Sequence, residues 1–276
     1  MPNVLVEKAR SHVTIIRLNR PERMNAMSID LCLELKSALE QVGHDNDCWI
    51  VVLTGAGRGF CSGLDLKDPS IIPNIDGLTI PRIGPRAIRI YSQLIPVMRH
   101  IPQPIIAAIN GPAYGGGMCL TLAADLRIAA ESAVFNSTGI VRGLTSTELG
   151  ASWLLPRLIG AANSNDILYT GRKVTAAEAL RMGLVSRVVA DAEILEHALT
   201  MAEDMCAYSP YGMQMTKQVI WANLETPSLA AAIELEDRNQ IMLGMTDNLP
   251  EAIAAYEQDR KPVYTDEPRR GIYPKD

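Results

Sequence analysis

The feature that most constrains the fold is an alternation of strand-like and helix-like runs that ends near residue 190. Short apolar runs rich in β-branched residues, which are typical of buried strands, occur at 13–18, 49–53, 105–109, 126–130 and 184–189. Helical patterns separate them, and the clearest opens on Ser28, a residue type that caps helices well. Strands that alternate with helices predict an α/β core over residues 1–190.

The pattern changes beyond residue 190, where every periodic segment is helical. Short turns separate four such segments, which lie at 191–207, 210–224, 228–244 and 248–260. A run of helices after an α/β core predicts a helical C-terminal region over residues 191–276.

Composition excludes several classes of protein. The 276 residues carry a net charge of −5 and no basic block, which argues against a nucleic-acid or membrane-surface partner. No apolar stretch reaches the roughly 18 residues of a spanning helix, and the first residues lack the apolar core of a signal peptide. The five cysteines are odd in number and form no CxxC pair, so we expect reduced thiols and a cytoplasmic protein. The four scattered histidines predict no metal site.

Residues 67–86 fit neither pattern. This segment holds four prolines and two glycines among apolar residues. Because proline fixes its own φ and lacks an N–H donor, we expect an irregular loop rather than a regular helix. A disordered insertion is one interpretation, but the isoleucines favour a lid or binding loop that packs on the core.

Two glycine-bearing turns directly follow strand-like runs. FCSGLDL (60–66) comes after the run at 49–53, and NGPAYGGGMCL (110–120) comes after the run at 105–109. We expect an apolar helix after each turn, with glycine leaving backbone N–H groups open to a cavity. Two such turns side by side either form an oxyanion hole, a pair of donors for a developing negative charge, or are tight turns with no chemical role. A further turn, GAGRG at 55–59, lacks the spacing of a dinucleotide-binding turn.

Five longer segments resemble a known family. In chain order they are NRPERMNAM (19–27), VVLTGAGRGFCSGLDL (51–66), IIAAINGPAYGGGMCLTLAADLRIAAESAVF (105–135), LLPRLIG (154–160) and GRKVTAAEALRMGLVSRVV (171–189). Together they resemble the crotonase superfamily, also called the enoyl-CoA hydratase/isomerase family, and the likeness runs from about residue 5 to 265. The resemblance implies a crotonase-like spiral of repeated ββα units and a helical C-terminal region that packs homotrimers or hexamers. It also implies an acyl-CoA thioester as substrate, with no tightly bound cofactor.

The resemblance further implies which residues form the site. It assigns two oxyanion donors, the N–H groups of Leu64 and Gly116, which would stabilise a thioester enolate. Contacts with coenzyme A are implied for Arg23, Met24, Asp65, Leu66 and Lys261 (or its neighbour Arg260). For Asp65 the sequence leaves an alternative, because SGLD (62–65) also fits a capping box at a helix start.

The chain departs from the family pattern where the hydratases carry two catalytic glutamates. One of these positions is Cys119 here, and the other is Gly139 or Ile140. Water addition needs one group that takes a proton from water and one that protonates the α-carbon, so the loss of both argues against efficient hydration. A thiol at a helix N-terminus can act as a base, but the apolar neighbours of Cys119 favour a buried, unreactive thiol.

One other carboxylate stands in a suitable place. Glu148 aligns with a catalytic aspartate of the dienoyl-CoA isomerases and chlorobenzoyl-CoA dehalogenases. It also fits a capping box, TSTE (145–148), and the sequence alone does not separate the two interpretations. Asp125 is interpreted as structural, whereas Asp68 and Asp76 on the proline-rich loop could reach the acyl end.

The sequence therefore predicts an acyl-CoA-processing enzyme similar to the enoyl-CoA hydratases and isomerases of fatty acid metabolism. The predicted mechanism is enolate stabilisation by the N–H groups of Leu64 and Gly116, with Glu148 moving one proton. The alternatives are a non-catalytic acyl-CoA-binding member and a CoA-thioester hydrolase. We expect residues 67–86 to select the acyl group, and their apolar composition predicts a hydrophobic chain or ring.

Overall fold

The central sheet has six strands in the order β1-β2-β3-β4-β6-β9, in a computed structural model that describes residues 1–265. Only β1 and β2 pair antiparallel, and the other neighbours are parallel. The strands are β1 (Val4–Arg10), β2 (Val13–Leu18), β3 (Ile50–Gly55), β4 (Ile105–Ile109), β6 (Leu126–Ala130) and β9 (Arg187–Val189). Each of the five runs predicted as strands contributes one of them. The sequence prediction omitted β1, an edge strand in which only Val4 is buried.

The sheet is buried on both faces, as continuous apolar runs predict. Along β3, Val51 and Leu53 face one hydrophobic cluster, whereas Ile50 and Val52 face a second cluster. Helix α7 covers the second cluster, and the other helices of the core pack on the first. These helices are α1 (Ile29–Gly43), α2 (Ile80–Ser92), α3 (Leu94–His100), α4 (Gly116–Ala123), α5 (Ala151–Thr170), α6 (Ala176–Met182) and α7 (Ile194–Cys206).

A second, smaller sheet runs beside the first. It contains β5 (Ala113–Tyr114), β7 (Val134–Asn136) and β8 (Val174–Thr175). Isolated bridges extend the row, since Cys61 pairs with Ala113 and Leu64 pairs with Met27. The chain therefore repeats one path, from a long strand through a short strand or bridge into a helix. This repeat is the predicted ββα spiral.

Helix α1 shows how the sequence pattern sets the packing. Ser28 caps it as predicted, because its Oγ accepts a hydrogen bond from the Leu31 N–H at 3.2 Å. Leu31, Leu35 and Leu39 are fully buried on one stripe of the helix. Full burial of one such leucine typically contributes about 1.5–3 kcal/mol to stability.

The proline-rich segment differs from its prediction. Residues 67–79 are irregular, but α2 begins at Ile80 and contains Pro81 and Pro85. Pro81 lies in the first turn, where a missing N–H costs no intrahelical bond, and Pro85 removes a single bond from the next turn. The prediction of an irregular loop was therefore wrong for residues 80–86.

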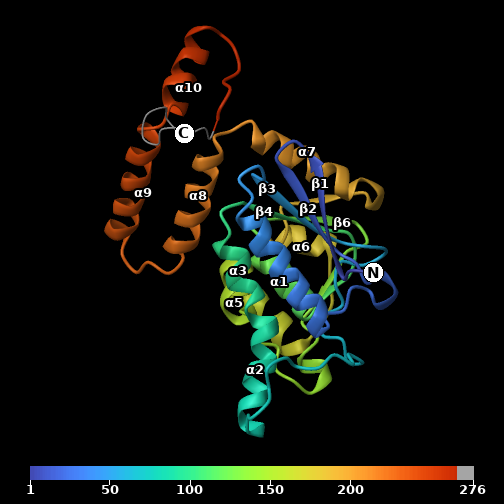
Figure 1. Cartoon of the computed structure of the whole chain (residues 1–276). Helices are drawn as coiled ribbons and strands as arrows, with labels where there is room; N and C mark the ends of the chain where they lie inside the picture. Colours follow the sequence, from blue (N-terminus) through green and yellow to red (C-terminus); the bar gives the residue numbers. More distant parts are fainter. Residues whose placement is uncertain (266–276) are drawn as a thin grey trace.

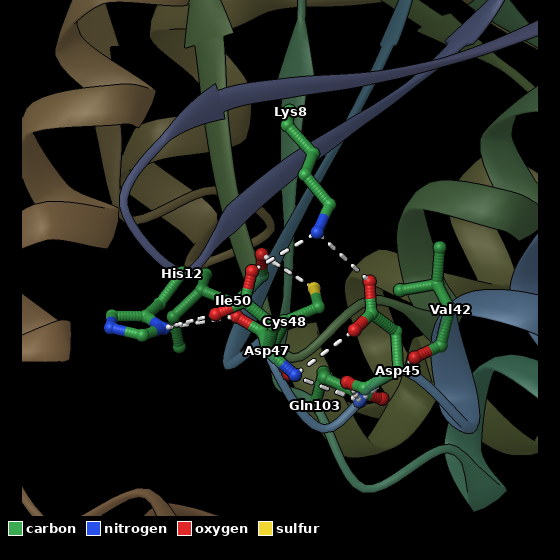
Figure 2. Close-up of polar contacts among 8 residues, drawn as sticks. All are labelled: Lys8, His12, Val42, Asp45, Asp47, Cys48, Ile50 and Gln103. Atoms are coloured by element: carbon green, nitrogen blue, oxygen red, sulfur yellow. Dashed lines mark hydrogen bonds and ion pairs between the residues drawn. The ribbon is translucent and has the colours of Figure 1, made fainter.

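A polar cluster closes the end of the sheet at which β3 begins (Figure 2). Gln103 Nε2 donates to the carbonyls of Val42 and Cys48 at 3.0 and 3.2 Å. Lys8 Nζ lies 3.0 Å from the Asp47 carboxylate (Figure 2). These contacts fix β1, the end of α1 and the start of β3 to one another. The carboxyl ends of β3 and β4 lie at the opposite end of the sheet, where the glycine turns begin.

The C-terminal helices are α8 (Pro210–Asn223), α9 (Leu229–Gly244) and α10 (Asn248–Glu257). They confirm the helical segments predicted there. Figure 1 shows α9 and α10 standing apart from the sheet, with α10 at the end of the molecule opposite α2. The last part of the predicted C-terminal region, 266–276, lies outside the described residues.

A buried lysine fixes α8 to the core. Lys217 Nζ donates to the carbonyls of Met98 and Gln103 at 2.9 and 2.8 Å, and it lies 3.1 Å from the Asp125 carboxylate. Asp125 also accepts a hydrogen bond from Trp221 Nε1 at 2.7 Å. Burial lowers the pKa of Lys217, and the charge of Asp125 opposes that shift. Asp125 is therefore engaged in the fold, in agreement with its structural interpretation.

Candidate active site

Leu64 lies on a turn that leaves its backbone N–H unpaired. Met27 donates its N–H to the Gly63 carbonyl at 2.7 Å, and the Asp65 N–H donates to the Met27 carbonyl at 3.1 Å. In a parallel bridge of this kind the N–H of the middle residue, Leu64, points away from the partner segment. Gly63 makes the turn possible with a φ of 84°. The Leu64 N–H has no hydrogen-bond acceptor among residues 1–265.

The glycine triplet begins α4. Gly115 adopts φ 51° and ψ −121°, a conformation that favours glycine. The Cys119 N–H donates to the Gly115 carbonyl at 3.1 Å, so the N–H of Gly116 lies in the first turn and has no intrahelical acceptor. All residues of α4 are buried, and its N-terminus adds partial positive charge to this donor.

The two glycine turns touch each other. A Cβ placed on Gly63 would lie 2.7 Å from the Tyr114 carbonyl oxygen and 3.5 Å from the Gly115 Cα. Backbone therefore packs on backbone here, and a side chain at Gly63 would separate the turns. Adjacent turns thus carry the N–H groups of Leu64 and Gly116, which the resemblance had paired.

Glu148 lies against the same glycine turn. Its Oε1 atom is 3.2 Å from the position that a Cβ would take on Gly115, and Thr138 Oγ1 is 2.5 Å from that position. The carboxylate is half-buried and makes no hydrogen bond or ion pair within residues 1–265. Burial raises the pKa of Glu148, which brings it closer to the range useful for proton transfer near neutral pH.

The capping interpretation of Glu148 is wrong. Helix α5 begins at Ala151, and its N-cap residue, Gly150, makes no side-chain hydrogen bond to the helix. The Thr145 hydroxyl instead accepts a hydrogen bond from the Thr147 N–H at 3.2 Å. Glu148 therefore does not cap α5, and its role in proton transfer stays a prediction.

Cys119 anchors the backbone of Glu148. Its Sγ donates to the Glu148 carbonyl oxygen at 3.5 Å, and the Ala151 N–H donates to the same oxygen at 2.8 Å. Burial, together with the nearby charge of Glu148, raises the pKa of the Cys119 thiol well above its ordinary value. This environment supports the prediction of an unreactive thiol.

Two residues near the site were not identified as candidates from the sequence. Leu149 has a φ of 44°, a strained value for leucine, and its Cδ2 lies 3.8 Å from the Cβ position of Gly116. Tyr91 of α2 is half-buried, and burial, with the charges of Asp68 and Asp65, raises its pKa to about 12. Backbone dihedrals and contacts across elements are not readable from one sequence, so neither residue could be found there.

The residues implied for coenzyme A lie mostly on two adjoining segments. The Ser62 N–H donates to the Met24 carbonyl at 3.0 Å, and Ser62 Oγ donates to the Arg23 carbonyl at 3.3 Å. Arg23 is exposed, and Leu66 is 74% exposed. Arg23, Met24 and Leu66 therefore border the turn that carries Leu64.

Asp65 and Asp68 are held by the protein itself. Arg20 Nη2 lies 2.9 Å from Asp65 Oδ2 with both side chains largely buried, and no helix begins at this turn, so the capping box predicted for Asp65 is wrong. Its backbone is also engaged, because its N–H donates to the Met27 carbonyl and its carbonyl accepts from the Asp68 N–H at 3.2 Å. Asp68 accepts hydrogen bonds from the N–H groups of Ile29 and Ser70 at 2.7 and 2.9 Å. Burial opposes the shift, but these hydrogen bonds lower the pKa of Asp68, which is therefore not free to reach an acyl group.

Lys261 is not brought to this site within one chain. It follows α10, which lies at the end of the molecule opposite α2 (Figure 1). Arg260 pairs with Glu251 at 2.6 Å, whereas Lys261 is exposed. A contact between Lys261 and a ligand at Leu64 would need the C-terminal region of another subunit.

Other kinds of site find no support in the part of the chain that the structure describes. Within residues 1–265 no group of three or more His, Cys, Asp or Glu side chains could hold a metal ion. Over the same residues no helix has both the length and the apolar character needed to cross a bilayer. All five cysteines are free thiols.

The fold and the site define a class of protein, a ββα spiral with two glycine turns at the carboxyl ends of adjacent parallel strands. A sequence model described as enoyl-CoA hydratase/isomerase matches residues 8–267. The chain belongs to the enoyl-CoA hydratase/isomerase family.

Its relatives carry names from both halves of that description. A Mycobacterium bovis protein named probable enoyl-CoA hydratase echA12 is 47% identical over 96% of this chain and 93% of its own length. The 1,2-epoxyphenylacetyl-CoA isomerase of Escherichia coli is 32% identical over 96% of this chain and 99% of its own. A crystal structure of a probable enoyl-CoA hydratase/isomerase from Mycobacterium abscessus matches with a TM-score of 0.92 and 45% identity, over 97% of this chain and 100% of that one. The predicted family, fold and class of acyl-CoA-processing enzyme are thus confirmed.

Proposed function

We propose that this enzyme isomerises enoyl-CoA thioesters by a 1,3-proton shift through an enolate. The observation that carries the proposal is the position of Glu148, a half-buried carboxylate beside the glycine turns that hold Leu64 and Gly116. Coenzyme A enters as part of the substrate, with no other cofactor. The free cysteines support the predicted cytoplasmic location.

In the proposed reaction Glu148 removes a proton from the α-carbon of a 3-enoyl thioester. The electron pair of that C–H bond forms a dienolate, whose negative charge rests on the thioester oxygen. The N–H groups of Leu64 and Gly116 donate to this oxygen, and one such donor is typically worth about 2.7–4 kcal/mol of barrier. The protonated Glu148 then returns its proton to the γ-carbon, which gives the 2-enoyl thioester.

Efficient hydration is disfavoured by the same geometry. It would need a second acid or base, and Cys119 is a buried thiol that donates to a backbone carbonyl. The other family position falls at Gly139 or Ile140, where neither side chain can carry a proton. A single carboxylate suffices for the isomerisation and also for activating water in a thioester hydrolysis.

The C-terminal region, residues 191–276, is proposed to assemble the enzyme into homotrimers or hexamers. A cavity of about 830 Å³ opens between α8, α9, α10 and the core, with Trp153 and Trp221 in its lining. Exposed apolar side chains continue from it over α9 and α10: Ile233, Ile241, Met242, Met245, Leu249, Ile253 and Tyr256. Such a surface fits a second copy of the chain, which could also bring its Lys261 toward a coenzyme A phosphate.

The substrate panel that tests this function has three members. Purified enzyme is incubated with trans-3-hexenoyl-CoA, crotonyl-CoA and hexanoyl-CoA. We measure formation of the conjugated double bond from the first, hydration of the second and release of free coenzyme A from the third. The proposal expects conversion of the first substrate to the conjugated 2-enoyl thioester well above hydration of the second. Release of free coenzyme A would favour the hydrolase alternative, and tight binding without any turnover would favour a non-catalytic binder.

A further inference from the structure

A second pocket lies between the irregular segment 73–78 and helix α2. Its volume is about 520 Å³, within the size range of small-ligand sites. Three arginines of α2, Arg82, Arg86 and Arg89, line it. Residues three and four apart in a helix share one face, with about 5–6 Å between their Cβ atoms, so the three arginine side chains line the same wall of the pocket.

These arginines have no acidic partner. Among residues 1–265 all ion pairs of arginine are formed by arginines other than these three. No Asp or Glu lines the pocket. Arg86 donates to the Asn74 carbonyl, which ties the irregular segment to α2. Arg82 and Arg89 make no side-chain hydrogen bond within the same residues. Like charges four residues apart destabilise a helix, so the cluster is unfavourable unless an anion joins it.

The packing of α2 does not explain the cluster either. The helix has no buried residue, and Pro85 interrupts its hydrogen-bond ladder. Tyr91, near the C-terminal end of α2, lies near Asp65 and Asp68, beside the turn that carries Leu64. The pocket is therefore formed by an exposed helix that borders the active site.

We propose that this pocket binds an oxyanion with two or more negative charges, carried by phosphate or carboxylate groups. Guanidinium groups bind both with paired, charge-assisted hydrogen bonds, and three of them suit more than one negative charge. The anion has two possible sources on an acyl-CoA ligand, a phosphate of coenzyme A or a carboxylate at the far end of the acyl group. That assignment to a source rests on the proposed function, whereas the anion site itself does not.

Inorganic pyrophosphate tests the site directly. Its binding to the full chain is measured by calorimetry at low, constant ionic strength, with Arg82→Gln and Arg89→Gln as variants. We choose these two because replacing Arg86 would also release Asn74. Each variant is expected to weaken binding by about tenfold or more, the loss of one charge-assisted contact. Arg181→Gln, an exposed arginine of α6, serves as the matched control and is expected to change nothing.

Two results would overturn the proposal. One is the absence of measurable pyrophosphate binding to the wild-type chain. The other is equal weakening by the two α2 variants and by the Arg181 control, which would indicate screening of general surface charge.

The source of the anion is determined by measuring how tightly the same variants bind acyl-CoA ligands. Weakened binding of butyryl-CoA but not of butyryl-dephospho-CoA assigns the site to the 3′-phosphate. Weakened binding of glutaryl-CoA beyond that of butyryl-CoA assigns it to a distal carboxylate. Pyrophosphate binding without any acyl-CoA binding would contradict the proposed function but would still support the anion site.

Discussion

At Gly115, backbone conformation and close contact together exclude a side chain. The residue adopts φ 51° and ψ −121°, and a Cβ there would meet Thr138 Oγ1 and Glu148 Oε1. Any substitution must therefore displace Thr138 Oγ1, and it must also shift the Glu148 carboxylate, on which the proposed chemistry depends, by a few tenths of an ångström. Gly160 in α5 offers a comparison, because it is also restricted (φ 76°, ψ 160°) but has no atom within 4 Å of its Cβ position.

We expect backbone strain to destabilise Gly115→Ala and Gly160→Ala by about 1–3 kcal/mol each, with a further loss for Gly115→Ala because its Cβ also overlaps Thr138 Oγ1. Only Gly115→Ala should also lose activity in the folded protein, by up to about 100-fold, which is the cost of misplacing reacting groups by about 1 Å. Thermal unfolding and kcat on a 3-enoyl-CoA separate the two effects. Equal activity loss in both variants would mean that strain, not displacement of Glu148, is responsible.

The raised pKa of Glu148 has opposite consequences for activity and stability. Activity needs the carboxylate ionised, so kcat/KM should fall as pH drops through a pKa above the ordinary glutamate value of about 4.3. Since the folded state holds this proton more tightly than the unfolded state, the associated stability is present below the unfolded pKa and is lost as pH rises through the folded pKa.

Glu148→Gln should therefore lower kcat by about 10²–10⁴-fold and slightly raise stability at neutral pH. The acidic limb of the pH profile should vanish in whatever activity remains. A pH–rate series with both proteins, alongside their unfolding midpoints, measures this. An unchanged acidic limb in the variant would remove Glu148 from the reaction.

For single residues, the sequence predicted which positions belong to the site better than it predicted the contacts that those residues make. The positions of Leu64, Gly116 and Glu148 came from a resemblance, and the structure places them on adjoining turns. Two capping boxes, at Asp65 and Glu148, were wrong in the structure because the same short motif can lie in a turn that no helix follows. Motif spacing alone carries no information about where the next helix begins.

Among the elements, α8 is held to the core by one buried side chain. Lys217 donates to two carbonyls of the core and pairs with Asp125, at only 4% exposure. Lys217→Met should therefore destabilise the protein by about 3–5 kcal/mol, because it leaves the largely buried Asp125 carboxylate without its cation. Lys36→Met is the control, since the exposed pair of Lys36 with Glu40 contributes about 0.3–0.5 kcal/mol.

Urea unfolding measures both free energies. A loss below 1 kcal/mol for Lys217→Met would contradict the role assigned to this lysine in docking α8. The prediction does not involve catalysis, so it stands independently of the proposed function.

Element types were predictable where the hydrophobic period was strong. The runs at 13–18 and 105–109 form strands with these same bounds, because continuous β-branched runs fit a sheet that is covered on both faces. The start of α2 was not predictable from proline content. Proline is excluded from the middle of a helix but is tolerated in its first turn, and a single sequence does not mark where the first turn lies.

For the whole molecule, the apolar face on the C-terminal helices predicts assembly. Met245→Asp places a charge on this face, where Met245 is 70% exposed in the single chain, and should convert the proposed trimers or hexamers to smaller species. Tyr169→Asp, at 79% exposure on α5, is the control and should leave assembly unchanged. Sedimentation analysis distinguishes the species, and a monomeric wild-type protein would contradict the assembly proposal.

The overall ββα path could be predicted because five ordered segments resemble the family along nearly the whole chain. The place of Lys261 could not, because it depends on how α9 and α10 leave the core. The direction in which a helix leaves the core has no periodic signal in one sequence.

The measurement that tests the central claim most directly is the transfer of an isotope label from the α-carbon to the γ-carbon. Enzyme is mixed with 3-hexenoyl-CoA deuterated at C2, and the 2-enoyl product is analysed by mass spectrometry and NMR. The account predicts that part of the deuterium appears at C4, because one half-buried carboxyl group both takes and returns the proton, and that Glu148→Gln abolishes the transfer. Product that forms without label at C4, at a rate unchanged by Glu148→Gln, would contradict it.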